Sequence, residues 1–577
     1  MLAVPPTSTA DMSDTSAIKV TPMPLLGTML PEAEAAGSTV ENHLSEAVAA
    51  WRAIVGQAGV QTDASALRAS TCQTFANAPS PSAIIRPENA EQVRDCVSVA
   101  FRYGIPLHPV STGLNWGYGS ASPPQDGSVV LHLSRLGRIL GYDPKLGTVD
   151  LEPGVTQGQL AKFLHEQGGR HWIDATGASP DASVIGTTLE RGFGHTPFAD
   201  HWLHICNLHV VMADGTCIQT GFGAMPGARA AACHRWGAGP DLDGLFAQSG
   251  LGVVTRLTMW LMPAPECTEA FFFTCANDDD LAQVIEALRP LRINGTLRSA
   301  MHIANPWKAL AAAAPGFGCR GLDQAQLLEE SRRMGMGAWN GSGCLYGSAG
   351  QVADSRRQLR HALAGKVGRL NFVGESRLRW AQRLAWPLGR LMRMDVERIM
   401  ELIVPVYRLM RGQPGYEHQR STWWGKPGEP PAVVDPDANR CGLLWWSPVV
   451  PLDGDQVALA ARTAAEILTA HSFLPQVVVN LPYPRSALVL ATITYDRDRP
   501  GEDSRAEACL SALRDRFDSL GYHPYRYGIQ GLAHWRRSLD PAYARILDRI
   551  ADAVDPCGIL GQKLGRGPRV ALRHLPT

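Results

Sequence analysis

A glycine-rich loop over residues 111–120 holds the first residues whose spacing suggests chemistry. Gly113, Gly117 and Gly119 come directly after a run that reads as a short strand. Glycine lets backbone N–H groups approach a phosphate closely, and successive N–H groups form a nest that binds anions. The loop is not the dinucleotide fingerprint, because that fingerprint opens a helix and two prolines follow here. The spacing therefore indicates a candidate phosphate site outside that motif.

A second unusual segment, residues 172–202, mixes small residues with Asp, Glu and His. Small residues allow a flat ligand to lie against the backbone, and Asp181, His195 and His201 offer polar groups. The alternative is a long structural loop with capping Asp and surface His side chains. His195, His201 and His204 suggest zinc, but no carboxylate or Cys completes a convincing ligand set. No metal site is therefore predicted.

Sequence periodicity predicts the elements that position these segments. The region before residue 265 reads as short strands and helices, with strand–helix–strand over 84–110, strands over 128–133, 148–152 and 252–262, a helix over 156–167 and a hairpin over 207–220. The region after it reads as strands over 271–275 and 476–495 with helices over 280–289, 323–335, 354–366, 377–411, 455–470, 504–520 and 540–554. Antiparallel strands with helices on one side predict an α+β fold.

Composition limits the classes of function. The 577 residues carry 54 Lys+Arg and 54 Asp+Glu. The formal net charge is therefore zero and gives no indication that the protein binds nucleic acid or an anionic membrane. The length predicts two or more domains. The sequence contains no uninterrupted apolar stretch of about 18 residues, so no membrane-spanning helix is predicted. The twelve Cys form no Cys-x-x-Cys pair and no secretory signal opens the chain, which indicates a cytoplasmic location. Residues 1–40 read as a mobile tail.

Several motifs together resemble the flavoproteins of the vanillyl-alcohol oxidase and p-cresol methylhydroxylase type. The similarity is dense from about residue 84 to 265 and returns in shorter stretches at 288–297, 443–454, 522–527 and 553–560. The segments that carry it include PVSTGLNWGYG (109–119), LEPGVTQGQL (151–160), SVIGTTLERGFGHTPFADHW (183–202) and LHVVMADGTCIQTGFGAMPG (208–227).

The resemblance implies a two-part FAD-binding domain of the p-cresol methylhydroxylase type with an inserted α+β cap domain that forms the substrate pocket. The implied boundaries are 41–265 for the FAD-binding domain, 266–499 for the cap and 500–577 for a segment that returns to the FAD-binding domain. In this family the glycine-rich loop holds the FAD pyrophosphate. The residues that the resemblance assigns to FAD are Ser111, Thr112, Gly113, Asn115, Gly117, Ser183, Glu190, Gly192, His195, Gly252 and Val254.

The resemblance also implies catalytic residues. Family members that oxidise para-substituted phenols bind the phenolate between two Tyr and one Arg, and Tyr118, Tyr525 and Arg526 match these positions. A guanidinium and two phenolic O–H groups lower the pKa of a bound phenol, and hydride then leaves its benzylic carbon for flavin N5. Without the resemblance, Tyr525 and Arg526 would read as an ordinary surface pair.

The sequence departs from the family in the segment before Ser183. The active-site Asp of the family's oxidases falls, without gaps, on Gly177 or Ala178, because the segment is one residue longer here. Asp181 is predicted to take that role, with Asp174 as the other candidate. The alternative is that Asp181 caps the following turn.

The second departure concerns the bond to the cofactor. Leu443 stands where some relatives carry a His that binds FAD covalently, and leucine cannot form that bond. We therefore predict non-covalent FAD, with Tyr416 as the remaining candidate for a link.

The leading hypothesis is an FAD-dependent oxidase or dehydrogenase of a para-substituted phenol, of the vanillyl-alcohol or 4-alkylphenol type. The alternatives are oxidation of a non-phenolic alcohol or larger natural product, and a flavin-binding protein with little turnover. Oxygen, a cytochrome or a quinone would accept the electrons, and relatives often form homodimers. No nucleic-acid or membrane partner is expected.

Overall fold

The computed structural model describes residues 33–319, 321–375, 378 and 396–566. Helix α1 (Ala33–Val55) begins inside the segment predicted to be a tail, and residues 1–32 of that tail lie outside the described residues. The chain divides into two units after Glu46, and every further element belongs to the unit that starts at Ala47. None of the helices described is long and apolar enough to cross a membrane.

The first sheet carries the glycine-rich loop. Its strand order is β1-β2-β4-β3, with β2 and β3 both parallel to β4. Helix α3 (Ala90–Tyr103) joins β2 to β3; Asn89 caps its first turn and Gly104 ends it in the left-handed conformation. The strands are β1 (Val60–Gln61), β2 (Ala83–Ile85), β3 (Leu107–Val110) and β4 (Val129–His132), with α2 (Ala64–Ser70) after β1. The strand–helix–strand prediction for 84–110 is confirmed.

The second sheet has five antiparallel strands in the order β5-β6-β10-β8-β9. Its buried side chains pack with those of α4 and α5 into one apolar cluster. The elements are β5 (Ile139–Asp143), β6 (Thr148–Leu151), β8 (Ile205–Val211), β9 (Cys217–Gln219), β10 (Val253–Trp260), α4 (Gln157–Glu166) and α5 (Val184–Leu189); β7 (His171–Trp172) and β11 (Met262–Pro263) form a separate pair. The predicted hairpin over 207–220 is β8–β9.

The third sheet is antiparallel and lies within residues 266–499, the segment predicted to form the cap. It runs in the order β15-β12-β14-β13-β18-β19-β16, and β17 also pairs with β19. Its strands are β12 (Cys267–Cys275), β13 (His302–Ala304), β14 (Trp339–Gly347), β15 (Arg369–Gly374), β16 (Cys441–Trp446), β17 (Val449–Pro451), β18 (Gln476–Asn480) and β19 (Ser486–Asp496).

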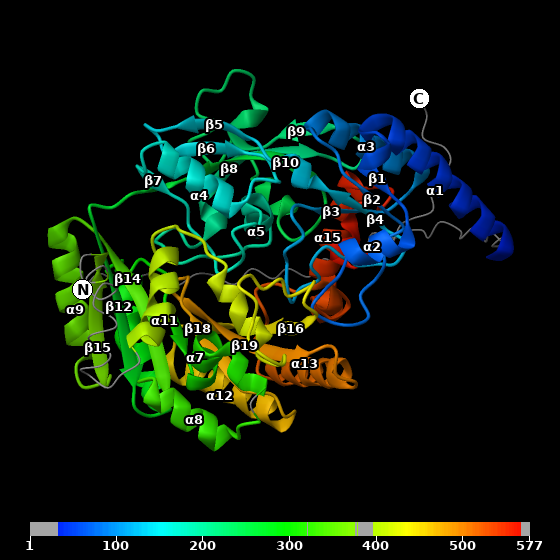
Figure 1. The fold of residues 1–577 in the computed structure, drawn as a ribbon. Helices are drawn as coiled ribbons and strands as arrows, with labels where there is room; N and C mark the ends of the chain where they lie inside the picture. The colour runs from blue at the N-terminus through cyan, green and yellow to red at the C-terminus, as the bar shows by residue number, and fades with distance from the viewer. Residues whose placement is uncertain (1–32, 320, 376–377, 379–395, 567–577) are drawn as a thin grey trace, which may run out of the picture. The chain divides into compact units, whose positions relative to one another are not determined.

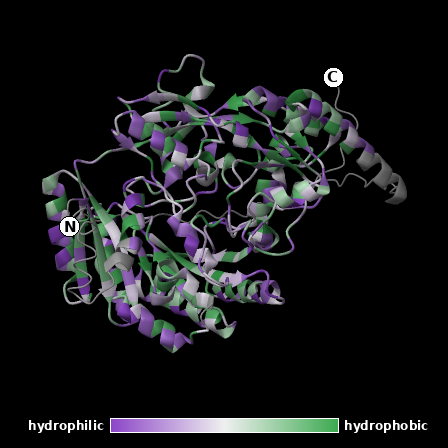
Figure 2. Cartoon of the chain, in the orientation of Figure 1, coloured by the Kyte–Doolittle hydropathy of each residue, from purple (hydrophilic) through white to green (hydrophobic). Residues whose placement is uncertain are grey.

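Alternation along these strands separates two faces. One face is apolar and packs against helices α6 (Asp280–Ile293), α9 (Ala349–Leu363), α12 (Gly454–Ala470) and α13 (Glu502–Ser519). Figure 2 shows that the strands of this sheet are mainly hydrophobic, whereas α8 (Gln324–Arg333) and α9 mix both kinds of residue. The opposite face lines a large cavity. Sheets with helices on one side confirm the predicted α+β fold.

The remaining helices of the described chain are α7 (Pro306–Ala313), α11 (Val396–Leu409), α14 (Leu532–Ser538) and α15 (Pro541–Val554). The predicted helix over 377–411 overlaps α11, and most of its part before Val396 lies outside the described residues. Helix α13 packs buried side chains into the apolar cluster of the third sheet, although the resemblance assigned residues 500–577 to the FAD-binding domain. Contacts with the first sheet come later in this segment, where Leu107 N donates to Ile559 O at 2.7 Å.

Candidate active site

One cavity of about 1670 Å³ collects most of the predicted site residues. Ligand pockets usually have about 300–1,000 Å³, so this one has room for a large cofactor together with a substrate. Ten of the eleven residues predicted to contact FAD line it; Gly117 is the exception. Tyr118, Tyr525 and Arg526 line it as well, whereas Asp181 does not.

The glycine-rich loop turns tightly at the end of β3. Asn115 O accepts hydrogen bonds from Tyr118 N and Ser120 N, both at 3.1 Å. Gly113 and Gly117 have φ values of +79° and +78°, which residues other than glycine rarely adopt. A Cβ atom on Gly117 would also collide with the ring of Trp445. The loop thus exposes backbone that a bound pyrophosphate could approach, which fits the predicted cofactor.

Two further segments stand beside this loop. Ser183 N donates to Thr112 Oγ1 at 3.0 Å, and Ser183 Oγ caps α5 by accepting from Gly186 N at 2.9 Å. Glu190, just after α5, forms an ion pair with Lys563 from the C-terminal segment. Burial alone would raise the pKa of Glu190, but the charges of Lys563 and Arg526 outweigh it and lower that pKa. Glu190 is therefore a fixed anion in the cavity wall.

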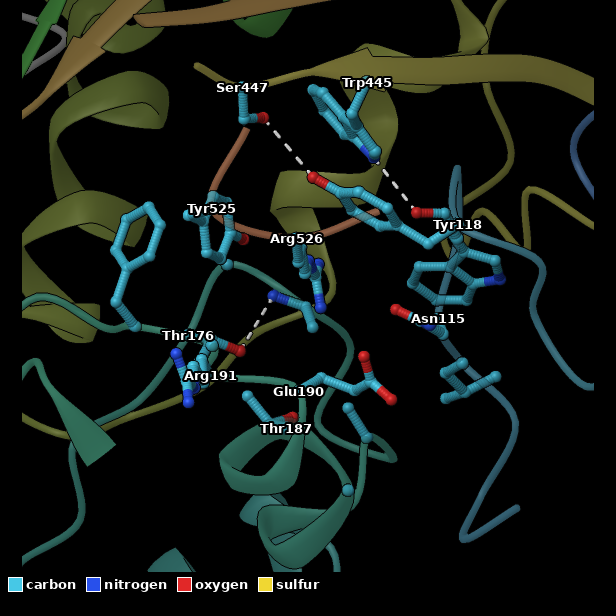
Figure 3. A pocket seen from close by; sticks show the side chains of 18 of the residues that line it. Asn115, Tyr118, Thr176, Thr187, Glu190, Arg191, Trp445, Ser447, Tyr525 and Arg526 are labelled. Carbon is cyan, nitrogen blue, oxygen red and sulfur yellow. Dashed lines mark hydrogen bonds between the residues drawn. The ribbon is translucent and has the colours of Figure 1, made fainter. Parts of the chain in front are cut away.

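Tyr118 meets the adjacent pair Tyr525 and Arg526 although more than four hundred residues separate it from them along the chain, as Figure 3 shows. Arg526 Cζ lies 3.8 Å from the centre of the Tyr118 ring and 5.5 Å from that of Tyr525. The Tyr118 hydroxyl lies 3.4 Å from Ser447 Oγ. Ile529 N donates to Tyr118 O at 2.9 Å, so the backbone also ties these two segments together.

Burial sets the protonation of this cluster. It raises the pKa of Tyr525 far above its ordinary value, and the charge of Arg526 only partly offsets this effect. Burial also disfavours the charged form of Arg526, but the neighbouring Tyr525, Tyr118 and Glu190 outweigh it and raise its pKa. The site therefore presents a permanent guanidinium and a neutral phenolic donor. Such a pair stabilises an oxyanion on a bound ligand.

The two predicted carboxylates lie elsewhere. Asp181 is exposed, and its Oδ2 accepts from Tyr416 Oη at 3.0 Å and Ser179 Oγ at 3.2 Å. Asp174 is buried, but its oxygens bind His201 Nε2 at 2.7 Å and the backbone N–H groups after Gly194. Asp174 thus orders the 172–202 loop, and neither carboxylate lines the cavity. The exposed position of Asp181 outside the cavity gives no support to the predicted catalytic role, which stays a prediction.

Two histidines from residues 266–499, His302 and His418, line the cavity. His302, on β13, places its Nδ1 2.6 Å from Asn480 Oδ1 on β18 and stacks on His195 with ring centres 4.3 Å apart. Burial lowers the pKa values of His302 and His418 to about 4, so both are neutral at pH 7. The Nε2 atoms of His302 and His418 are buried and have no hydrogen-bond partner within the described chain. Sequence reasoning missed both, because His302 lies on β13 and His418 in a 3₁₀ helix (Glu417–Trp423), more than a hundred residues apart along the chain.

The metal ligand set considered from the sequence does not assemble. His201 pairs with Asp174, and His204 stacks on Phe198 with ring centres 3.9 Å apart. Across residues 33–319, 321–375, 378 and 396–566, no group of three or more His, Cys, Asp or Glu side chains could hold a metal ion.

Comparison with known proteins agrees with this geometry. Residues 81–221 match the model of the FAD binding domain family. The chain is 40% identical to the 1'-carboxy-chondrochloren decarboxylase of Chondromyces crocatus, over 90% of this chain and 96% of the relative. It is 30% identical to the 4-cresol dehydrogenase [hydroxylating] flavoprotein subunit of Pseudomonas putida, over 84% of this chain and 87% of the relative.

Solved structures give the same result. A p-cresol methylhydroxylase with bound substrate superposes with a TM-score of 0.80 at 27% identity, covering 91% of this chain and 97% of the other. A 4-ethylphenol oxidase from Gulosibacter chungangensis in complex with isoeugenol gives 0.81 at 27% identity, covering 90% and 96%. The predicted resemblance is confirmed, and the chain belongs to the p-cresol methylhydroxylase family of FAD-dependent oxidoreductases.

Proposed function

We propose that this protein removes hydride from the benzylic carbon of a para-substituted phenol. The observation that carries the proposal is the cluster of Tyr118, Tyr525 and Arg526, in which a buried guanidinium lies against a phenolic ring at 3.8 Å. Two relatives support it, since one is named for 4-cresol and another for 4-ethylphenol.

The cluster binds the hydroxyl end of the substrate. Arg526 and the two Tyr hydroxyls favour the phenolate over the phenol, because the charge on the oxygen meets a guanidinium and two donors in a water-poor site. FAD, when bound, accepts the hydride. The phenolate electrons replace those that leave with the hydride, so the ring becomes a neutral quinone methide. Water then adds to that species, or its side chain loses a proton to give an alkene.

Anaerobic flavin reduction by 4-ethylphenol tests the proposal. Tyr525→Phe and Arg526→Met are expected to slow reduction by about 10²- to 10³-fold, as for the loss of one donor to a developing oxyanion. Tyr522→Phe is the matched control, because the Tyr522 hydroxyl donates to Gln456 away from the cavity. Reduction by 4-ethylphenol at the unaltered rate in both variants would show that the cluster binds no phenolate.

We also propose that FAD is held without a covalent bond. Leu443 lines the cavity and carries no nucleophile, and Tyr416 lies outside the cavity with its hydroxyl on Asp181. Acid precipitation is expected to leave the yellow colour in the supernatant. Colour in the pellet would contradict this and would direct peptide mapping to His418, the cavity-lining histidine nearest Tyr416 in sequence.

A second candidate reaction is oxidation with loss of CO₂, favoured by the 40% identical relative whose name describes a carboxy-compound decarboxylase. In 3-(4-hydroxyphenyl)propanoate, loss of the phenol proton and the benzylic hydride gives a quinone methide. Cleavage of the bond to the carboxylate then supplies the electron pair of the new C=C bond, the phenolate takes up a proton, and CO₂ leaves. Formation of 4-vinylphenol with one equivalent of CO₂ per flavin reduced would identify this reaction.

The electron acceptor follows from the reoxidation of the reduced protein. Fast reoxidation by dissolved oxygen identifies an oxidase. Slow reoxidation by oxygen with fast reoxidation by a cytochrome or quinone identifies a dehydrogenase.

A further inference from the structure

Lys308 in α7 is a cavity-lining cation for which neither the fold nor the proposed chemistry supplies a role. Its ammonium Nζ lies 5.2 Å from the centre of the Trp445 ring, and no carboxylate of the described chain pairs with it. The buried Lys426 and the partly buried Lys563 behave differently. Lys426 is paired with Asp496 and Asp498, and Lys563 with Glu190.

The position of Lys308 is unfavourable for an unpaired cation. The residue lies in the first turn of α7, which Asn305 caps, and this end of a helix carries partial positive charge. Burial lowers the pKa of Lys308 to about 8, because the ammonium loses hydration and gains no anion in return. A ligand carboxylate in the adjacent space would reverse both effects, since it would neutralise the ammonium and face the positive end of the helix.

Strand β16 relates this ammonium to the phenol site. Trp445 on β16 and Ser447 just beyond it both line the cavity, and Figure 3 shows them beside Tyr118. Ser447 contacts the Tyr118 hydroxyl, whereas Lys308 lies over the Trp445 ring. Two residues along a strand span about 7 Å. The cavity thus offers an oxyanion site and, further along the same strand, a separate cation.

We propose that Lys308 binds a carboxylate carried by the para substituent of the substrate, which makes the preferred substrates 4-hydroxyphenyl compounds with an acidic side chain. The phenolic end rests on the proposed function, whereas the carboxylate end rests on Lys308 alone. The proposal assigns Lys308 a role in selecting the substrate, not in hydride removal.

Calorimetric titration of the dithionite-reduced holoenzyme tests this without turnover. The ligands are 3-(4-hydroxyphenyl)propanoate and its methyl ester, and the readout is the ratio of their dissociation constants. The acid is expected to bind the unaltered protein about 10- to 100-fold more tightly than the ester, the range of a hydrogen bond between charged groups. Lys308→Met is expected to remove that preference, and Lys308→Arg to keep most of it. Lys145→Met, on an exposed loop, is the matched control.

The ratio separates binding from folding, because a general defect weakens acid and ester alike. Equal affinities in the unaltered protein, or a preference that survives Lys308→Met, would overturn the proposal. 3-Phenylpropanoate, which lacks the hydroxyl, separates it from the proposed function. Lys308-dependent binding of 3-phenylpropanoate, with no flavin reduction by 4-ethylphenol, would uphold the carboxylate site and reject the phenol.

Discussion

The two walls of the cavity differ in what they present to a ligand: one presents mainly backbone and the other mainly side chains. The wall on the FAD-binding side consists mainly of loop backbone, with glycines at positive φ and with the carboxylate of Glu190 paired to Lys563. The wall on the cap side consists mainly of side chains, from strands of the third sheet and from helical segments such as α7. It keeps the Nε2 atoms of His302 and His418 without hydrogen-bond partners within the described chain, and Lys308 without a carboxylate.

This difference indicates a division of labour. A backbone wall whose charges are already satisfied suits one unchanging ligand, because backbone geometry does not vary with side-chain substitution. A side-chain wall with unsatisfied groups suits a ligand that completes them, and each substitution there changes which ligand fits. Relatives that share the first wall can therefore act on different compounds.

The strongest test of the backbone wall is Gly117→Ala. The new Cβ would occupy space held by the Trp445 ring, at a φ of +78°. Strain of about 1–2 kcal/mol for the left-handed conformation and about 1–3 kcal/mol for overpacking predict a loss of about 2–5 kcal/mol in the free energy of unfolding. Denaturant titration measures that loss, and flavin content after gel filtration is expected to fall with it.

Gly127→Ala provides the matched control. Gly127 has nearly the same φ, +76°, and nothing within 4 Å of the added atom. This variant should therefore lose only the part of the unfolding free energy that comes from the left-handed conformation, and it should keep its full flavin content. Equal losses in the two variants would mean that Trp445 does not constrain the loop.

Part of the backbone wall could be predicted from the sequence because its signals are local. Glycines after a strand, the turn of the hairpin over 207–220 and strand alternation each act within a few residues. The eleven FAD contacts came from the family resemblance, and ten of them line the cavity. The prediction for Asp181 rests on shifting the family's Asp past one extra residue, and spacing alone does not reveal where in the turn that residue is accommodated.

The side-chain wall could not be predicted in the same way. His302 meets Asn480 across 178 residues, and Lys308 meets Trp445 only after β16 and α7 have packed over the same cavity. No local pattern distinguishes these residues from ordinary strand or helix positions. Tyr525 and Arg526 would have been missed too, but the family resemblance supplied them.

A smaller effect tests the cap histidines through the pH dependence of stability. Because the pKa of His302 in the folded protein is about 4, below the ordinary value of about 6.5, the unfolded chain binds a proton first as the pH falls. The contribution to stability is complete above pH 6.5 and declines toward pH 4. When the pH falls from 7.5 to 5, the free energy of unfolding of His302→Gln is expected to decrease by about 1–2 kcal/mol less than that of the unaltered protein. Denaturant titrations at both pH values measure this difference.

His165→Gln is the control for this experiment, since His165 is an exposed residue of α4. An unchanged pH dependence in His302→Gln would show that water or a bound ligand solvates the imidazole. The side-chain wall would then be less dry than its unpartnered nitrogens indicate.

The smallest effect concerns Ser447, whose hydroxyl joins the two walls through Tyr118 at 3.4 Å. This distance is long for an O–H···O hydrogen bond, so the contact contributes less than about 1 kcal/mol. Ser447→Ala is expected to slow flavin reduction by 4-ethylphenol less than about fivefold, against no change in Ser519→Ala at the exposed end of α13. A hundredfold loss in stopped-flow reduction would show that Ser447 holds Tyr118 in place. The walls would then act as one unit, because a change on the cap side would reposition a ring that belongs to the glycine-rich loop.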